Sequence, residues 1–442
     1  MNAPSARRGA EGPMPLSSAP MPKEPSGEVD VVVLGAGSAG IAAARRLLAA
    51  GLRVAVLDAR RRVGGRAATV ALKGHPVDLG AHWLHNGPIN PLVRLARARG
   101  EPLRQAPGER HLVIGRRFAT PRESASLIRT FAQADAAIGR AMRREEDQAA
   151  ARALPPLGPF GRRVLTVEGL VSGRPFDEVS LHDVPDMDYA DNFFMAGGLG
   201  AYVARLARPV PVRLGIAARV LDWSGKGVRV ETDAGSLRAR AAIVTLPMAV
   251  LQREGLRFTP GLPIPVREAI HGFVPGVYEH VILHWPDAPF HGPDRLAMLL
   301  GGREEPPGLL TRIDGTPFHF FELDLPTASR FDGRDPDAPG RYARAVLADQ
   351  FGHRAIRTLQ VCRSTAWRHD PFSGASWAVV PPGLVAIRDR LKAPVADRVW
   401  FAGEALSRAQ WGTVGGAWEE GERAASEIAA YLGPKGSDPA FS

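Results

Sequence analysis

Three glycines near the start of the chain have the spacing of a site for the pyrophosphate of a dinucleotide. Gly35, Gly37 and Gly40 follow the apolar run Val31–Leu34. Because glycine has no Cβ, the first can form a tight turn, the second can admit a phosphate close to the backbone, and the third can let a helix pack closely on a strand. Asp58 ends the next apolar run and can accept hydrogen bonds from ribose hydroxyls. These residue types at this spacing predict dinucleotide binding.

The elements around the glycines fit this chemistry. The alanine-rich segment Ile41–Ala50 predicts a helix, and Arg53–Leu57 predicts a second strand that leads into the acid. The start of such a helix offers unpaired N–H groups and the positive end of a dipole to the phosphates. A plain strand–turn–helix connection could share the glycines, but strand, turn, helix, strand and acid together favour a nucleotide site.

The composition is that of a globular enzyme and lacks a recognisable nucleic-acid or metal module. Of the 442 residues, 45% are hydrophobic and 23% are charged, and the length allows two domains. The net charge is +10, but the basic residues are mostly arginines spread along the chain, so we expect no nucleic-acid partner. Cys362 is the single cysteine, which excludes an intramolecular disulfide and a cysteine-based zinc cluster, and we expect no metal.

The N-terminal residues predict neither secretion nor a membrane anchor. Residues 1–28 are rich in Pro, Ser, Ala and Gly and predict a disordered tail. Arg7 and Arg8 form a twin arginine, but no apolar core follows them, and no apolar run approaches the length of a membrane span. We therefore expect a cytoplasmic protein without a membrane partner.

A second glycine-containing turn lies near the other end of the chain. Phe401–Glu404 follows a predicted strand at 399–401 and precedes a predicted helix at 416–432. Between the two turns, the segment from about 90 to 192 has helical and loop patterns, and strands are predicted at 212–214, 220–223, 228–232, 242–246 and 277–285. We expect an α/β fold in which distant segments form one dinucleotide domain interrupted by a substrate domain, an arrangement that favours FAD over NAD.

Motifs spread over the chain carry a family signature. They are Gly35–Gly40 with Asp58, Gly64–Arg66, Asp78–His85, Phe401–Glu404 and Gly412–Ala417. Together they resemble the flavin-dependent amine oxidases, the family of monoamine oxidases, polyamine oxidases and lysine-specific histone demethylases, and the segment ending at His85 is most similar to polyamine oxidases. The family usually has Glu where this chain has Asp58. The resemblance implies a two-domain architecture, with a Rossmann-like FAD-binding domain of the GR2 type and an α+β substrate domain with a mixed sheet.

The resemblance also predicts how the segments divide between the two domains. The FAD-binding domain is expected from residues 29–90, 196–258 and 393–433. The substrate domain is expected from residues 91–195, mostly helical, and 259–392, mostly sheet, with tails at 1–28 and 434–442.

The FAD contacts that the resemblance implies come from every part of the predicted FAD domain. They are Gly35, Gly37, Ser38, Ala39, Gly40, Asp58, Ala59, Arg60, Gly64, Gly65, Arg66, Gly80, Ala81, His82, Trp83, Val220, Thr245, Pro247, Trp367, Gly403, Glu404, Gly412, Thr413, Val414 and Ala417. Glu404 can accept hydrogen bonds from ribityl or ribose hydroxyls, and a helix that begins at Thr413 can stabilise negative charge on the flavin. Three of these residues also have a simpler structural interpretation. Val220 could be a core residue, Pro247 could end a strand, and Thr413 could cap a helix.

Aromatic residues form the substrate cage that the resemblance implies. Trp367 would flank the flavin, Trp377 would form one wall of the cage, and Thr413 would form the opposite wall. Aromatic faces orient an amine and tolerate a nearby cation. Both tryptophans could instead be core residues on neighbouring strands. Ala375 and Ser376 stand where some relatives attach the flavin through a cysteine, so FAD is expected to be noncovalent.

Histidines occupy the remaining catalytic positions. His280 stands where the family usually places a lysine that holds a water near flavin N5, and a solvent-facing strand histidine is the alternative. His85 matches an active-site histidine of polyamine oxidases and would orient substrate or handle protons. His82 and His85 lack the third ligand of a metal site.

The function that follows is FAD-dependent amine oxidation. A hydride would pass from the amine α-carbon to flavin N5, giving an imine that hydrolyses to a carbonyl, and O2 or another acceptor would reoxidise the flavin, with H2O2 as the product of the first. The substrate would be a small polyamine or monoamine, and a polyamine pocket needs carboxylates, for which the candidates are Asp186, Asp188, Asp191 and Glu322. The alternatives are a desaturase or porphyrinogen-type oxidase of the same fold, and an FAD-binding interaction protein that has lost turnover. The oligomeric state is left open.

Overall fold

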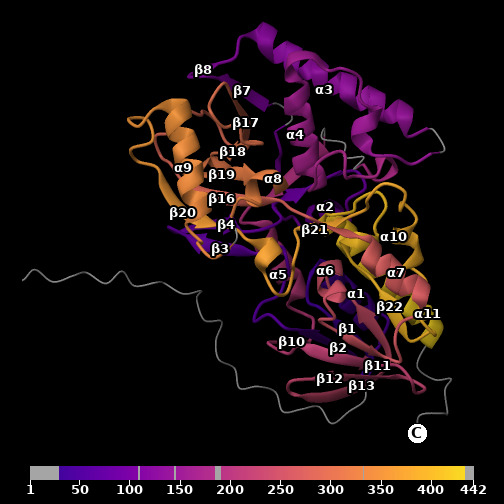
Figure 1. Ribbon diagram of the computed structural model, residues 1–442. Helices are drawn as coiled ribbons and strands as arrows, with labels where there is room; N and C mark the ends of the chain where they lie inside the picture. Colours follow the sequence, from indigo (N-terminus) through magenta and orange to yellow (C-terminus); the bar gives the residue numbers. More distant parts are fainter. Residues whose placement is uncertain (1–28, 108–109, 144–145, 185–190, 332, 434–442) are drawn as a thin grey trace, which may run out of the picture.

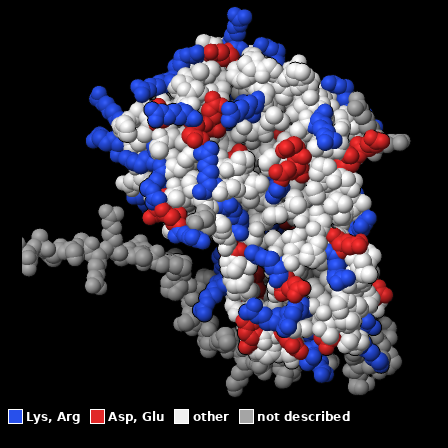
Figure 2. Space-filling model, in the orientation of Figure 1, with Lys and Arg blue, Asp and Glu red and all other residues white. Residues whose placement is uncertain are grey.

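The computed structural model of the chain describes residues 29–107, 110–143, 146–184, 191–331 and 333–433. The predicted tails at 1–28 and 434–442, and also Asp186 and Asp188, lie outside these residues. Two large sheets dominate the described chain and occupy the lower and upper halves of Figure 1. On the face that Figure 2 shows, basic side chains lie over both halves with acidic ones among them, in keeping with basic residues spread along the sequence.

An eight-stranded sheet carries the first glycine turn. Its strands follow the order β10-β2-β1-β13-β12-β11-β14, and β22 also pairs with β13. The strands are β1 (Val29–Leu34), β2 (Val54–Asp58), β10 (Val212–Leu214), β11 (Ala218–Asp222), β12 (Val228–Thr232), β13 (Gly235–Val244), β14 (Arg257–Thr259) and β22 (Val399–Phe401). β10, β2, β1, β13 and β22 run parallel, so their carboxyl ends meet at one edge. Gly35, Asp58, Thr245 and Gly403 therefore lie along this edge, where open α/β sheets bind ligands.

Two helices from opposite ends of the chain cover this sheet together. They are α1 (Ser38–Ala49) and α11 (Val414–Leu432). A Cβ at Gly421 would lie 2.1 Å from the carbonyl oxygen of Ala39, so the two helix backbones are in direct contact. The buried apolar residues of α1, α11, β1 and β22 form one continuous core. This packing joins the two predicted cofactor segments into one unit.

A seven-stranded sheet forms the second half. Its strands follow the order β20-β16-β19-β18-β17-β7-β8. They are β7 (Arg110–Ile114), β8 (Arg117–Phe118), β16 (Glu279–His284), β17 (Arg295–Leu300), β18 (Leu309–Thr311), β19 (Phe318–Leu323) and β20 (Gln360–Ser364). The helical and loop description of residues 90–192 is therefore incomplete, because β7 and β8 join this sheet through parallel pairing of β7 with β17. That pairing spans a long stretch of sequence, so local periodicity cannot reveal it.

The strand predicted at 277–285 is present as β16 but begins two residues later, and a separate short strand precedes it. β15 (Val274–Gly276) pairs with β21 (Trp377–Val379), whereas β16 begins at Glu279 and pairs with β19 and β20. The break falls at Val277 and Tyr278. As a result, the chain passes from the Trp377 strand to the His280 strand within a few residues, and the side chain of Tyr278 lies between them.

The remaining elements connect and cover the two sheets. The helices are α2 (Pro91–Ala98), α3 (Pro121–Ala141), α4 (Gly161–Ser172), α5 (Leu199–Ala207), α6 (Met248–Gln252), α7 (Ile264–Gly272), α8 (Leu325–Ala328), α9 (Ala338–Phe351) and α10 (Ile387–Arg390). The smaller sheets pair β3 (Thr69–Leu72) with β4 (His75–Asp78), and β5 (Trp83–Leu84) and β6 (Leu103–Gln105) with β9 (Phe193–Met195). Within the described residues, no helix has both the length and the apolar character needed to cross a bilayer.

Candidate active site

The first glycine turn has open space beside Gly37, whereas Gly40 has no room even for a Cβ atom. A Cβ on Gly40 would lie 1.9 Å from the carbonyl oxygen of Gly35, so this glycine is required for close packing of helix and strand. Gly37 is different, because a Cβ there would meet no atom within 4 Å. Gly37 also forms a parallel bridge with Gly64, which brings the second glycine pair to the same turn. The open space at Gly37 fits a phosphate that approaches the backbone.

The acid at the end of β2 is held against this turn. The carboxylate of Asp58 accepts hydrogen bonds from the backbone N–H groups of Ala36 and Arg60, both at 2.7 Å. Burial raises the pKa of Asp58 above its ordinary value, although the two N–H groups act in the opposite direction. Each carboxylate oxygen can accept more than one hydrogen bond, so a ribose hydroxyl can still bind here.

Glu404 joins the first and last predicted cofactor segments to the strand that carries Trp377. Its carboxylate lies 3.0 Å from Nη1 of Arg66, and it also accepts hydrogen bonds from the backbone N–H groups of Ala378 and Gly412. The hydroxyl of Ser38 donates to the carbonyl oxygen of Val414 at 2.8 Å, which adds a second link between the N-terminal and C-terminal segments. The structure thus brings together residues that the sequence places hundreds of positions apart.

Thr413 lies at the start of α11, and Trp377 is the first residue of the strand β21. The Thr413 side chain caps α11 by accepting a hydrogen bond from the N–H of Gly416 at 2.9 Å. A Cβ on Gly412 would lie 3.2 Å from the Trp377 ring, so the loop before the helix packs against that ring. The indole N–H of Trp377 donates to the carbonyl oxygen of Ser172 at 3.0 Å, which fixes its orientation. The helix-cap reading of Thr413 is correct, and it is compatible with a place in the cage.

Trp367 lies in a short turn beside the segment that begins at Asp78. Its indole N–H donates to the carbonyl oxygen of Leu79 at 3.0 Å, and a Cβ on Gly80 would lie 2.9 Å from its ring. The Arg60 guanidinium lies 5.9 Å from the ring centroid. Trp367 and Trp377 are both only partly buried, so neither is an ordinary core tryptophan.

His280 belongs to a buried aromatic cluster. Its ring lies 4.3 Å from the ring of Phe320, 5.8 Å from that of His82 and 5.9 Å from that of Tyr278. His280 is fully buried, so the solvent-facing alternative is wrong, and neither ring nitrogen has a hydrogen-bond partner within the described part of the chain. Burial lowers the pKa of His280 to about 3 and that of His82 to about 4, so both are neutral near pH 7.

The second histidine of the pair lies beside this cluster. The ring of His85 stacks on that of Trp83 at 5.5 Å with an interplanar angle of 6°. Burial lowers the pKa of His85 to about 4, and its Nδ1 has no hydrogen-bond partner. Among the described residues, no group of three or more His, Cys, Asp or Glu side chains is arranged to hold a metal ion.

Glu322 is the carboxylate candidate that the structure brings to the cluster. It is His280's direct partner across the β16–β19 ladder, and it accepts a hydrogen bond at 3.1 Å from the hydroxyl of Tyr278. The ring of Tyr278 in turn lies 6.1 Å from that of Trp377. Burial raises the pKa of Glu322 above its ordinary value. Sequence reasoning had no signal for the place of Glu322 and missed Tyr278 altogether, because both depend on the pairing of β16 with β19.

Thr245 lies at the carboxyl edge of the eight-stranded sheet and Pro247 lines a cavity, whereas Val220 lies level with the start of β13, away from that edge. The hydroxyl of Thr245 donates to the carbonyl oxygen of Leu34 at 2.9 Å. Val220 is half-buried on β11. Pro247 precedes α6 and lines a narrow cavity together with Arg66, Trp377 and Glu404.

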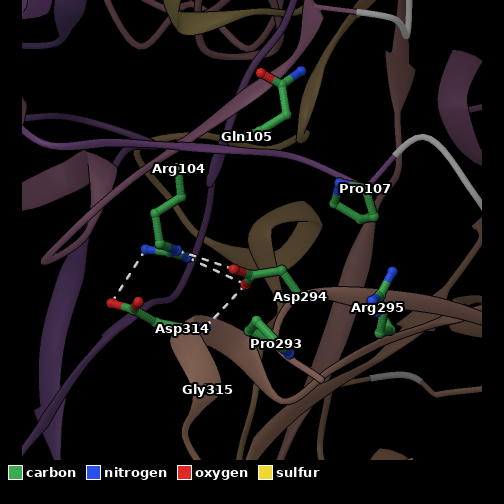
Figure 3. A pocket seen from close by; sticks show the side chains of 8 residues that line it. All are labelled: Arg104, Gln105, Pro107, Pro293, Asp294, Arg295, Asp314 and Gly315. Carbon is green, nitrogen blue, oxygen red and sulfur yellow. Dashed lines mark hydrogen bonds and ion pairs between the residues drawn. The ribbon is translucent and has the colours of Figure 1, made fainter. Parts of the chain in front are cut away.

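A wider pocket is lined by residues that were not predicted as site residues. Figure 3 shows it, with a volume of about 490 Å³ and a charged lining of Arg104, Asp294, Arg295 and Asp314. Arg104 is paired with Asp294 at 3.0 Å and with Asp314 at 3.1 Å. Its guanidinium lies 5.6 Å from the ring centroid of Phe194, and the Phe194 ring lies 6.3 Å from that of His82. Phe194 therefore lies close to both the charged pocket and the histidine cluster.

Known relatives match nearly the whole chain. Lysine-specific histone demethylase 1 homolog 3 of Oryza sativa subsp. japonica is 29% identical over 469 residues, which cover 94% of this chain and 56% of that protein. Polyamine oxidase 2 of Arabidopsis thaliana is 28% identical over 449 residues, which cover 90% of this chain and 87% of that protein. The chain thus spans between about half and two thirds of the demethylases it matches, which are longer proteins.

A solved structure confirms the fold class. Putrescine oxidase bound to putrescine superposes with a TM-score of 0.75 at 19% identity, over 91% of this chain and 99% of that one. The predicted two-domain architecture of FAD-dependent amine oxidases is thereby confirmed as the fold. The relatives support FAD as the cofactor, and the open space at Gly37 and the cluster around Glu404 fit it. The family described as flavin containing amine oxidoreductase matches residues 38–429, and the chain belongs to that family.

Proposed function

We propose that this protein oxidises a small amine that carries a second cationic group, such as a short diamine, with noncovalent FAD. The observation that carries the proposal is Glu322, a buried carboxylate beside an aromatic cluster that otherwise holds neutral histidines. A buried carboxylate whose hydrogen-bond partner is a tyrosine hydroxyl gains stability when a cation binds next to it. A diamine brings one amino group to react and a second, protonated one to pair with this carboxylate.

The FAD site is proposed along the carboxyl edge of the eight-stranded sheet. Gly37 and the start of α1 would hold the pyrophosphate, Asp58 a ribose, and Arg66 with Glu404 the groups between ribose and flavin. The start of α11 at Thr413 would place a positive dipole end near the flavin. When bound there, FAD supplies the acceptor for a hydride equivalent from the substrate α-carbon. The imine product then hydrolyses to a carbonyl compound and a smaller amine.

The histidines would control which protonation state of the amine reacts. Nδ1 of His82 lies 3.0 Å from the carbonyl oxygen of Gly80, so this nitrogen carries the proton and Nε2 is left as an acceptor. Nε2 is buried and has no hydrogen-bond partner among the residues that the structure describes. It can therefore accept a hydrogen bond from an amine N–H. Because these rings stay neutral, they do not repel an incoming cation, and Trp377 can stack over it.

The environment of His280 bears on which electron acceptor reoxidises the flavin. Oxygen chemistry benefits from a positive charge that stabilises the first reduced oxygen species, but His280 is neutral and packs against Phe320. We propose that O2 is a slow acceptor for this protein and that another acceptor serves it better.

A substrate panel under anaerobic conditions tests the proposal. The purified holoprotein is mixed with diamines, acetylated polyamines, monoamines of matched length and amino acids, and the loss of the oxidised flavin absorption is followed. We expect the diamines to reduce the flavin fastest. If matched monoamines reduce the flavin with the same rates and affinities as diamines, Glu322 does not recognise a second amino group. Bound FAD that no amine reduces would favour the desaturase or interaction-protein alternatives.

A further inference from the structure

A second buried carboxylate lies directly beside the histidine cluster but faces away from it. Glu279 precedes His280 on β16 and is 2% exposed. Side chains alternate along a strand, so Glu279 points to the opposite face from His280. Its Oε2 accepts a hydrogen bond from the hydroxyl of Thr365 at 2.6 Å, and its Oε1 accepts one from the backbone N–H of Arg368 at 3.1 Å. Neither the sequence motifs nor the proposed chemistry uses this residue.

Both partners of Glu279 connect it to predicted site residues. The Thr365 hydroxyl also accepts the backbone N–H of His280 at 2.8 Å, and the N–H of Thr365 donates to the carbonyl oxygen of His280 at 2.9 Å. Arg368 belongs to the short turn Trp367–His369 that carries the flavin-flanking tryptophan. The carboxylate of Glu279 therefore links the strand of His280 to the turn of Trp367.

This carboxylate has little compensation for its charge. The guanidinium of Arg368 donates to the carbonyl oxygens of Ala328 and Phe331, not to Glu279. Directly opposite on β19 lies Leu323, an apolar residue. Among the described residues, no Lys, Arg or His forms an ion pair with Glu279. The charged form is thus held by one hydroxyl and by backbone N–H groups, with Arg368 as the nearby cation.

We propose that Glu279 is a positioning residue that holds the Trp367 turn against the FAD site through its ionised carboxylate. The inference rests on the proposed FAD site. The ionised form accepts hydrogen bonds from both Thr365 and Arg368. Protonation would remove the negative charge that strengthens both of these hydrogen bonds, since hydrogen bonds to an ionised carboxylate are stronger than those to a neutral carboxyl group. The link would then weaken and the Trp367 turn would shift.

Glu279 is expected to change its protonation state near neutral pH. Burial raises the pKa of Glu279 to about 7, while the hydroxyl of Thr365, the N–H groups of the turn and the field of Arg368 lower it. The neighbouring His280 and His82 have pKa values of about 3 and 4 and do not titrate near neutrality. A pH-dependent signal from Trp367 near neutral pH would therefore come from Glu279 and not from the histidines.

The test compares flavin absorption and tryptophan fluorescence across neutral pH in the wild-type holoprotein and in variants. Trp367→Phe isolates the fluorescence of Trp367 by difference. We expect a pH step in the wild type that is lost in Glu279→Gln, and lost or displaced in Thr365→Val. The conservative Thr365→Ser variant should retain the step, since it keeps the hydroxyl.

Glu168→Gln is the matched control. Burial also raises the pKa of Glu168 to about 7, but this residue lies on α4, away from the Trp367 turn. Its replacement should leave the step unchanged. A step that persists in folded Glu279→Gln, or a wild type that binds FAD without any step, overturns the inference. If no FAD binds, the proposed function fails instead, and the fluorescence difference still reports on the Glu279 link.

Discussion

The Arg66 guanidinium and the Glu404 carboxylate lie 3.0 Å apart although 338 positions separate them in the chain. The side chains are 22% and 7% exposed, so the pair is mostly shielded from water. Glu404 also accepts N–H groups of Ala378 and Gly412, which tie β21 and the start of α11 to the same point. This one carboxylate thus holds together the second glycine pair, the Trp377 strand and the final helix.

Breaking the Arg66–Glu404 pair should reduce FAD binding more than breaking the Arg104–Asp294 pair, which has similar geometry. Arg66→Met leaves Glu404 without its cation, and we expect FAD affinity to fall about 10- to 100-fold, since hydrogen bonds to charged groups contribute about 1.5–3 kcal/mol. Arg104→Met is a close control, because the Arg104–Asp294 pair has the same 3.0 Å separation and the same exposed fractions of 22% and 7%. Equal losses of FAD affinity, measured by flavin fluorescence, would contradict a special role for Arg66.

A methyl group at Gly37 should block the cofactor without harming the fold. A Cβ at this position meets no protein atom within 4 Å, so Gly37→Ala should keep the melting temperature of the wild-type apoprotein. The added methyl would occupy the space proposed for the pyrophosphate, and FAD should be absent from the purified variant. Gly225→Ala is the control, since its Cβ also meets nothing within 4 Å and it lies far from this turn in the sequence. Full FAD content in Gly37→Ala would contradict the proposed phosphate site.

The carboxylate of Glu322 should discriminate diamines from monoamines. Glu322→Gln keeps the shape but removes the charge, so we expect KM for a diamine to rise about 10- to 100-fold while KM for a monoamine of equal length changes little. Tyr278→Phe, which removes the hydroxyl that donates to Glu322, should have a smaller effect in the same direction. The measurement is anaerobic reduction at varied amine concentration. Equal changes for both substrate classes would show that Glu322 does not contact the second amino group.

Oxygen reactivity should depend on His280. His280→Lys introduces an ammonium group where a neutral ring now lies, and we expect reoxidation of the reduced flavin by O2 to become at least about 10-fold faster. His284→Lys on the same strand is the control, because it adds the same charge at a position that is only partly buried. The measurement is the rate at which flavin absorption returns when air is admitted. An unchanged rate in His280→Lys would place His280 away from the reactive part of the flavin.

Buried neutral His280 should also change how stability depends on pH. Its folded pKa of about 3 lies below the ordinary value of 6.5, so the unfolded chain binds more protons as pH falls through 6.5. His280→Gln removes the imidazole that must lose a proton when the chain folds at low pH. The free energy of unfolding of the variant, relative to wild type, should therefore be about 2 kcal/mol higher at pH 5 than at pH 7. Urea unfolding at the two pH values measures this. The exposed His291→Gln variant controls for the substitution, and a difference independent of pH would mean that His280 is not buried in its neutral form.

The sequence predicts the parts of the molecule that depend on local pattern. The turn at Gly35, the helix α1 and the acid Asp58 are consecutive, and the structure has them within a residue or a few of the predicted bounds. The strand at Val399–Phe401 has the predicted bounds as well. Their apolar runs and glycines carry the information directly.

Other features follow from pairing between distant strands and were not predictable in this way. Glu322 reaches the histidine cluster because β16 and β19 pair in one particular register, which sets it opposite His280. A shift of that register by one residue would turn Glu322 to the other face of the sheet. The strand β7 was missed for the same reason, since its partner β17 lies far along the chain. The break that places Tyr278 beside Trp377 also depends on tertiary pairing with β21.

The central claim is that FAD binds at the glycine turn and accepts hydride from an amine bound beside Trp377 and Glu322. The most direct measurement is an anaerobic titration of the purified wild-type holoprotein with a short diamine, followed by flavin absorption. We expect one FAD per chain and complete loss of the oxidised flavin absorption at saturating diamine. Absence of FAD, or bound FAD whose spectrum no diamine or monoamine changes, would contradict the account.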